Sequence, residues 1–285
     1  CLDMKVQGYV VPEFIDAKKA YIKYFENGGE VGSSVAAYYN SKLVVDLQGR
    51  YANLEAKYEY NKNIIQFVFS STKIMGGVNF LATQLTKSDF ENLDKLANIL
   101  AIQLHYLMEV DPKHRTIGQI ITKEISTQYN LEFYLLLLPN ILPRNKKISI
   151  SFILNLLDQD DLMIKTFNHT FPGLPNIFEL GEVTKFEVFK FEGSSVIKFT
   201  NTKLIAKLGA IITNNRQPLN DNDNSRPLLS KNTIDLISTK LLIAWDHIFK
   251  ENVTYLISGF LYIRFPGIEN VEFLELREVG RSIFI

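Results

Sequence analysis

The sequence predicts a single domain, residues 1–285, of the α/β (α+β) class, in which an antiparallel sheet is built from both chain ends and flanked by helices. Two observations support this class. A helix and a β-hairpin are expected first, then a mainly helical stretch, and strand patterns return near the end. Hydrophobic residues make up 46% of the 285 residues, which is enough for a sizeable core.

The N-terminal elements have the clearest patterns. Apolar residues recur at helical spacing over residues 12–27, and Pro12 suits a first helical turn, so a helix is expected there. Strands are expected over residues 31–39 and 43–47. The short polar connection Asn40-Ser41-Lys42 predicts that these two strands form a hairpin.

The rest of the chain alternates between helical and strand patterns. Apolar periodicity predicts further helices over residues 89–110, 116–128, 148–158, 200–214 and 232–242. Alternating or continuous apolar runs predict strands over residues 183–199, 253–265 and 271–276. The helices therefore separate the two groups of strands along the chain.

Charge and composition exclude several function classes. Thirty-one basic residues balance thirty-one acidic ones, and no basic block occurs, so neither a nucleic-acid partner nor an anionic membrane surface is expected. No apolar run reaches the roughly 18 residues that a membrane span requires. The single cysteine, Cys1, cannot form an intramolecular disulfide, which favours an intracellular protein without fixing the compartment. Because the chain begins with Cys, we expect a fragment, a processed form or an incomplete gene model.

No metal or cofactor site is expected from the sequence. The four histidines are scattered and lack metal-ligand spacing. They are His105, His114, His169 and His247. No glycine-rich nucleotide-binding pattern occurs either.

The motif that carries chemistry is Ser70-Ser71-Thr72-Lys73, which follows a short apolar run where a helix is expected to begin. Residues three apart share a helical face, so the Lys73 amine can approach the Ser70 hydroxyl. A helix N-terminus favours negative charge on the serine oxygen, and a partly desolvated lysine can act as a base. Ser70 is therefore the candidate nucleophile and Lys73 the candidate base. The structural alternative is a helix N-cap followed by a solvated lysine.

The four-residue pattern does not decide between these readings by itself. A second match, Ser195 to Lys198, lies in an alternating, strand-like run and is expected to be accidental. Only the sequence around Ser70 can distinguish its motif from the accidental match.

That surrounding sequence resembles the serine β-lactamase-like, penicillin-recognising family, specifically its class C β-lactamase and esterase branch and the animal β-lactamase-domain proteins. The matching segments, in order, are residues 8–10, 25–30, 31–36, 44–49 and 68–73. Residues 110–119 are moderately similar, and residues 201–208 and 229–235 are weaker echoes. The resemblance implies a serine hydrolase that forms an acyl-enzyme on Ser70 with a small ester, amide or peptide.

Two departures from the family pattern bear on activity. The family places a tyrosine motif between the two similar blocks, but in this sequence the interval between them, residues 74–109, is short. Its single tyrosine, Tyr106, lies too near the second block to match that motif. Tyr38-Tyr39-Asn40 fits the letters Y-x-N but precedes Ser70, so we reject it as the base. The family also needs a late strand that lines the oxyanion hole, and the chain ends at residues 280–285, where that strand would start.

Two functional hypotheses follow from these observations. The first is an active esterase- or peptidase-like serine hydrolase whose helical subregion is shortened and whose C-terminus is incomplete. The second is a catalytically inactive relative that serves as a binding or structural protein, or a truncated gene product. The substrate, the second base and the oligomeric state are left open.

Overall fold

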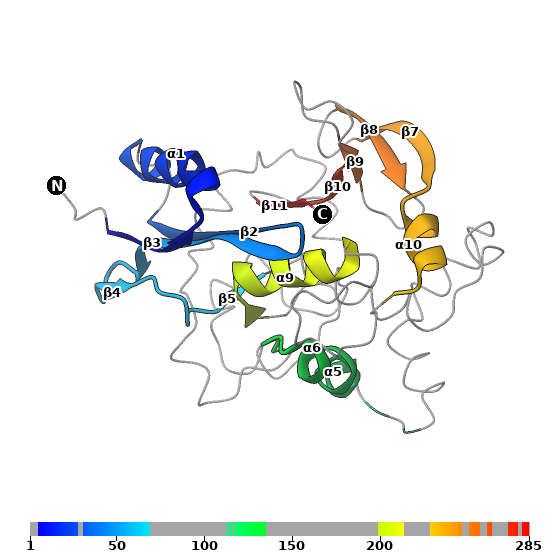
Figure 1. Ribbon diagram of the computed structural model, residues 1–285, viewed down its shortest axis with the longest axis horizontal. Coiled ribbons are helices and arrows are strands. Elements are labelled where there is room, and N and C mark those ends of the chain that lie inside the picture. Colours follow the sequence, from blue (N-terminus) through cyan, green and yellow to red (C-terminus); the bar gives the residue numbers. More distant parts are fainter. Residues whose placement is uncertain are drawn as a thin grey trace, which may run out of the picture.

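The computed structural model describes residues 5–27, 31–68, 113, 115, 117–134, 199–213, 229–246, 251–256, 261–263, 273–278 and 281–284 (Figure 1). The expected elements over residues 89–110, 148–158 and 183–198 lie outside these described residues.

An antiparallel sheet forms from the N-terminal part of the chain. Its strands are β1 (Val6–Val10), β2 (Gly32–Tyr39), β3 (Lys42–Asn53) and β4 (Tyr58–Glu59). β3 is central and pairs with β1 on one side and β2 on the other, while β4 pairs with its far end. β3 extends well beyond its predicted end at residue 47, because the polar residues that follow still pair with neighbouring strands.

The β2–β3 hairpin is confirmed, and its turn has only two residues. Tyr39 pairs with Lys42, and the residues between them, Asn40 and Ser41, have φ angles of 45° and 63°. Positive φ at both central positions is the type I′ geometry, whose twist matches that of the flanking strands. The polar connection therefore sets the register next to the turn, and this register shifts between Ala37 and Tyr38.

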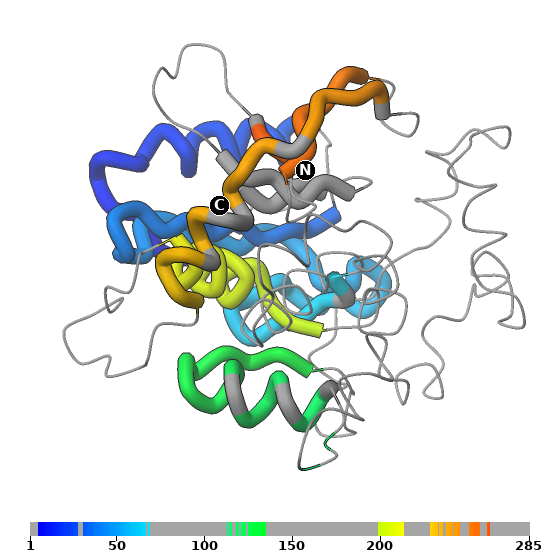
Figure 2. The backbone as a smooth tube through the Cα atoms, turned by 90° about the vertical axis from the view of Figure 1, so that its right-hand side faces the viewer, coloured from blue at the N-terminus to red at the C-terminus, as the bar shows by residue number. Residues whose placement is uncertain are grey.

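Two helices cover opposite faces of this sheet (Figures 1 and 2). A short 3-10 turn, η1 (Pro12–Phe14), leads into α1 (Ile15–Glu26), which confirms the first predicted helix. The Phe25 ring lies so close to Gly49 that a Cβ atom there would be 2.4 Å from the ring. On the other face lies α9 (Thr202–Thr213), which confirms the helix predicted over residues 200–214.

The alternation of β3 explains why each face takes a different helix. Val45 and Leu47 are buried in an apolar cluster that includes Phe14 and Tyr21 on the α1 side. Asp46 and Gln48 are buried on the opposite face, where Lys203 of α9 meets Asp46. β3 therefore presents aliphatic side chains to α1 and a buried polar pair to α9.

A second antiparallel sheet forms from the C-terminal part of the chain. Its order is β11-β10-β9-β8-β7. The strands are β7 (Lys240–Asp246), β8 (Glu251–Leu256), β9 (Leu261–Ile263), β10 (Phe273–Glu278) and β11 (Arg281–Phe284). The strand predicted over residues 271–276 is confirmed by β10. The strand predicted over residues 253–265 is instead two strands, β8 and β9, which pair antiparallel with each other. β11 adds a further strand where the sequence suggested only an incomplete end.

The helix predicted over residues 232–242 is wrong at its C-terminal end. α10 (Lys231–Ile237) stops earlier, and Leu242 belongs to β7. The hydroxyls of Ser238 and Thr239 donate to the carbonyls of Ile234 and Asp235, and thus bind carbonyls of the last helical turn. Pairing of β7 with β8 then holds the leucines in a strand, although their spacing also suits a helix.

The helix predicted over residues 116–128 is confirmed as one helical segment with a wider turn in its middle. It consists of α5 (Ile117–Ile120), the π-helical turn η3 (Ile121–Ser126) and α6 (Thr127–Tyr129). Asn130 ends it in the left-handed conformation, with φ of 50°.

A short ladder joins two distant parts of the chain. β5 (Gln66–Phe67) pairs with β6 (Phe199–Thr200), which leads directly into α9. The prediction of antiparallel strands from both chain ends is confirmed, but the described strands form two main sheets and this ladder, where one sheet was expected. No helix in the described part of the chain is long and apolar enough to cross a bilayer.

Candidate functional site

The predicted nucleophile and base, Ser70 and Lys73, both lie outside the described residues. Val68 is the last described residue before Ser70, and it is fully buried. The other sequence candidates outside the described residues are Tyr106, Ser195, Lys198 and the four histidines. The described part of the candidate site consists of the residues that hold the chain leading up to Val68.

Three chain segments converge at this point. Phe67 of β5 pairs with Phe199 of β6, and Phe199 also exchanges two backbone hydrogen bonds with Tyr134, at 2.9 and 3.0 Å. The Thr200 hydroxyl donates to the carbonyl of Glu132 at 2.8 Å. Phe199 and Thr200 have no exposed surface. The segment that precedes Ser70 thus belongs to a closed, hydrogen-bonded junction.

A chain of partly buried side-chain hydrogen bonds lies beside this junction. The Tyr60 hydroxyl donates to Gln66 Oε1 at 3.2 Å and shares a hydrogen bond with Ser34 Oγ, also at 3.2 Å. Ser34 Oγ in turn shares a 2.6 Å hydrogen bond with Thr202 Oγ1. Buried polar groups require such partners, because an unpaired one costs the full penalty of its lost hydration. The four side chains therefore connect β5, β2 and α9.

An ion pair fastens the first turn of α9 to the polar face of the sheet. Lys203 Nζ lies 3.1 Å from Asp46 Oδ2, and the Gln48 side-chain amide donates to the other oxygen of Asp46. Asn201 Oδ1 accepts a hydrogen bond from the Leu204 backbone N–H at 3.0 Å, as an N-cap residue does. The start of α9 is thus fixed both by its cap and by a buried carboxylate.

The same carboxylate affects the neighbouring tyrosine. Tyr38 is partly buried, and this burial, with a smaller contribution from the negative charge of Asp46, raises the pKa of its phenol above the usual value of 10.0. Tyr38 therefore stays protonated at neutral pH and keeps an O–H group that can donate a hydrogen bond. Tyr38 lies near the end of β2, before the turn at Asn40, which agrees with the strand end that the sequence predicts there.

The described residues of this arrangement are suited to positioning the chain. Within the described ranges there is no group of three or more His, Cys, Asp or Glu residues that could bind a metal ion. The hydroxyls of Tyr60, Ser34 and Thr202 are engaged with one another, so they fix the geometry around β5.

Sequence reasoning missed most of these supporting residues. Asp46 carried a usable signal, because a charged residue inside a buried apolar strand has to find a partner. Tyr60, Gln66 and Thr202 carried no such signal. Their contacts depend on the pairing of β5 with β6, two segments far apart in sequence.

Comparisons with known proteins give similarities in structure alone. No known family profile matches the sequence, and no curated protein matches it. A penicillin-binding protein homologue from Caulobacter crescentus is similar in structure, with a TM-score of 0.62 and 14% identity over 90% of this chain and 83% of that chain. A family VIII carboxylesterase has a TM-score of 0.60 and 16% identity, over 91% of this chain and 84% of that one.

A third solved structure agrees with these two. EstA from Arthrobacter nitroguajacolicus Rue61a has a TM-score of 0.61 and 16% identity, and the match covers 92% of this chain and 83% of that one. At such low identity the likeness concerns the fold and not the activity. It confirms, for the fold, the resemblance seen in the sequence. The chain has the fold of the serine β-lactamases and penicillin-binding proteins.

Proposed function

We propose that this protein is a β-lactamase-related serine hydrolase that forms an acyl-enzyme on Ser70 with a small ester, amide or peptide substrate. Lys73 is the base in this proposal. Two findings support it: the Ser70-x-x-Lys73 motif in its family-like sequence context, and a fold shared with a carboxylesterase and a penicillin-binding protein homologue.

The observation that carries the proposal is the fixed position of the chain just before Ser70. Gln66 and Phe67 are paired in the ladder with β6, and Val68 is buried. A nucleophile has to be held within a fraction of an ångström of its productive position, and a rigid element directly before it provides that support.

The proposed reaction has two steps. In the first, the neutral Lys73 amine takes the proton of Ser70 as Oγ attacks the substrate carbonyl carbon, and the proton then passes to the leaving alcohol or amine as its bond to that carbon breaks. In the second, water attacks the acyl-enzyme ester, releases the carboxylic acid and returns the proton to Ser70. Each step consumes only substrate and water.

A second candidate function is an inactive binding protein of the same fold. It is favoured by the state of Tyr60, a described phenol close to the Ser70 entry. Its hydroxyl is buried and already bonded to Gln66 and Ser34, so it supports structure and is not available to relay protons. The short segment of residues 74–109, which holds no tyrosine motif, points the same way.

Active-site labelling separates the two candidates. A fluorophosphonate probe should label the folded wild-type chain at one site, and Ser70→Ala should abolish the labelling. Ser195→Ala, in the second S-x-x-K match, should label like the wild type and is the matched control. Lys73→Met should slow labelling by about 10²- to 10⁴-fold, the usual contribution of a general base.

The outcome that supports the inactive candidate is equally clear. A wild-type chain that is folded by circular dichroism but takes up no probe and turns over no p-nitrophenyl acetate would overturn the hydrolase proposal. Labelling that persists in Ser70→Ala would overturn the assignment of the nucleophile.

A further inference from the structure

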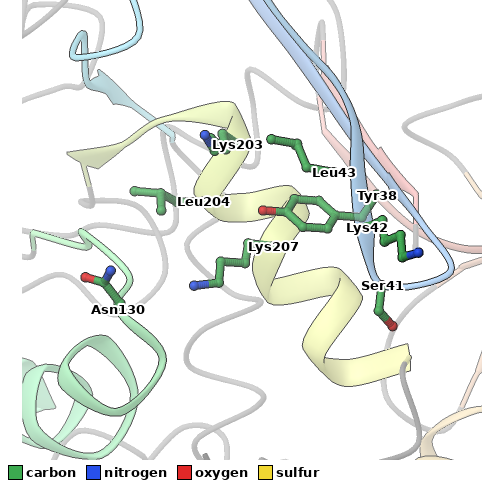
Figure 3. A pocket seen from close by; sticks show the side chains of 8 residues that line it. All are labelled: Tyr38, Ser41, Lys42, Leu43, Asn130, Lys203, Leu204 and Lys207. Carbon is green, nitrogen blue, oxygen red and sulfur yellow. The ribbon is translucent and has the colours of Figure 1, made fainter. Parts of the chain in front are cut away.

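A pocket lies between the β2–β3 turn and α9, and the proposed hydrolase chemistry makes no use of it (Figure 3). Its volume is about 470 Å³, within the range of about 300–1,000 Å³ that is usual for small-molecule sites. Its lining includes Tyr38, Leu43, Asn130, Lys203, Leu204 and Lys207.

We propose that this pocket binds a small organic anion through its carboxylate or phosphate group, between the Tyr38 hydroxyl and the Lys207 amine. The shared chemistry is an oxyanion that accepts several hydrogen bonds. This inference does not depend on the reactivity of Ser70.

The first support is that donor groups line the pocket. Lysine ammonium groups donate and cannot accept, and the Asn130 amide offers two further donors. Figure 3 shows the Tyr38 hydroxyl directed across α9, toward the side on which Leu204, the Lys207 amine and Asn130 lie. The phenol makes no hydrogen bond to any described residue. An oxyanion is the ligand that several converging donors bind best.

The second support is the orientation of these groups. Lys207 Nζ donates to the Tyr129 carbonyl at 2.7 Å, which holds the amine at the pocket wall. Asn130 follows directly in a left-handed conformation that ends the preceding helix. Tyr38 keeps its proton because burial, and then Asp46, raise its pKa. Donors that are held in place lose less entropy when a ligand binds.

The third support is the balance of charge. Three of the described lining residues are lysines, Lys42, Lys203 and Lys207, and none of the described lining residues is acidic. Asp46 is paired with Lys203 at 3.1 Å. The Lys42 amine points away from the other donors in Figure 3, so it adds attraction at longer range without direct contact.

The apolar part of the lining limits the ligand further. Leu43 and Leu204 contribute hydrocarbon surface on either side of the donors. A ligand with a short apolar body attached to its acidic group would bury this surface and bind more tightly than a bare ion. An acid with a larger apolar body, such as benzoate, is therefore expected to bind better than acetate.

Titrations with inorganic phosphate, acetate and benzoate at constant ionic strength test the proposal, with ¹H–¹⁵N NMR shifts of the intact chain as the readout. We expect saturable shifts at the β2–β3 turn and in α9, and the preferred probe identifies phosphate or carboxylate as the recognised group. Tyr38→Phe and Lys207→Gln should each weaken binding by about tenfold, the effect of one hydrogen bond to a charged group.

The control is Lys23→Gln, which removes the same charge from an exposed residue of α1. It should change the affinity by less than about twofold, since a remote surface charge is screened. Tyr38→Phe keeps the aromatic ring, so it remains informative if Lys207→Gln fails to fold. No saturation with any of the three anions, or equal affinity in Tyr38→Phe and wild type, would overturn the proposal.

Discussion

At the scale of single residues, Tyr60 connects several elements around the candidate site. Its hydroxyl bonds to Gln66 and Ser34, and its backbone carbonyl accepts a 2.7 Å hydrogen bond from the Gln7 side chain of β1. The residue is only 1% exposed. This one residue therefore links β1, β2 and β5, through polar contacts of its hydroxyl and its carbonyl that only the folded chain brings together.

Tyr60→Phe removes the hydroxyl while keeping the ring. We expect it to lower the free energy of unfolding by about 1–3 kcal/mol, because Ser34 and Gln66 lose a buried partner. Urea unfolding followed by circular dichroism measures this loss. Tyr58→Phe is the matched control, since Tyr58 is 44% exposed and should change stability by less than about 0.5 kcal/mol. Equal stability of Tyr60→Phe and wild type would mean that the hydroxyl chain carries no stability.

At the scale of elements, the local sequence pattern predicted the helix and the turn, because interactions between neighbouring residues determine them. The helical spacing before Glu26 and the two-residue turn at Asn40 and Ser41 were visible in the sequence, and both are confirmed. The end of α10 was not, because leucines at residues 241–242 satisfy a helix as well as a strand, and pairing with β8 decides. The β5–β6 ladder left no local signal at all.

The turn between β2 and β3 allows a test at this scale. Ser41 has φ of 63°, a conformation that costs an L-residue about 1–2 kcal/mol and glycine almost nothing. Part of this gain is offset by the greater freedom of glycine in the unfolded chain, which costs about 0.5–1 kcal/mol. Ser41→Gly should therefore stabilise the protein by up to about 1 kcal/mol and raise the melting temperature by about 2 °C.

Ser41→Ala is the matched control for this turn. It removes the hydroxyl but keeps the Cβ atom that disfavours positive φ, so it should not stabilise the protein. Calorimetry on both variants provides the measurement. A rise in melting temperature with alanine as large as with glycine would show that the backbone conformation is not the cause.

At the scale of the whole molecule, the described chain consists of two antiparallel sheets that come from its two ends. The class of fold followed from the order of elements along the sequence. The division into two sheets did not follow, because hydrogen bonding between distant strands depends on packing and not on local spacing. The prediction of a single domain further requires that the two sheets unfold as one cooperative unit.

Trp245 offers a direct test of that cooperativity. It is the only tryptophan, it lies on the edge strand β7 of the second sheet, and it is 51% exposed. Its fluorescence therefore reports the C-terminal sheet, while far-ultraviolet circular dichroism reports the helices α1 and α9 as well. For a single domain we expect both signals to change at the same urea concentration.

The control for this experiment is Trp245→Phe, which should lose the tryptophan signal and keep the circular dichroism transition. Because the side chain is half exposed, the substitution should cost less than about 0.5 kcal/mol. A fluorescence midpoint that clearly precedes the circular dichroism midpoint would show that the second sheet unfolds separately.

Because side chains alternate along β3, the register of this one strand determines which residues face α1 and which face α9. Val45 and Leu47 lie on the α1 side, whereas Asp46 and Gln48 lie on the α9 side. A slip of β3 by one residue would turn the carboxylate toward the apolar cluster and two aliphatic side chains toward Lys203. A single inserted residue in the turn before β3 would thus disturb the hydrophobic core and the anchoring of α9 together. The two-residue loop of this hairpin is where a length change would be tolerated least.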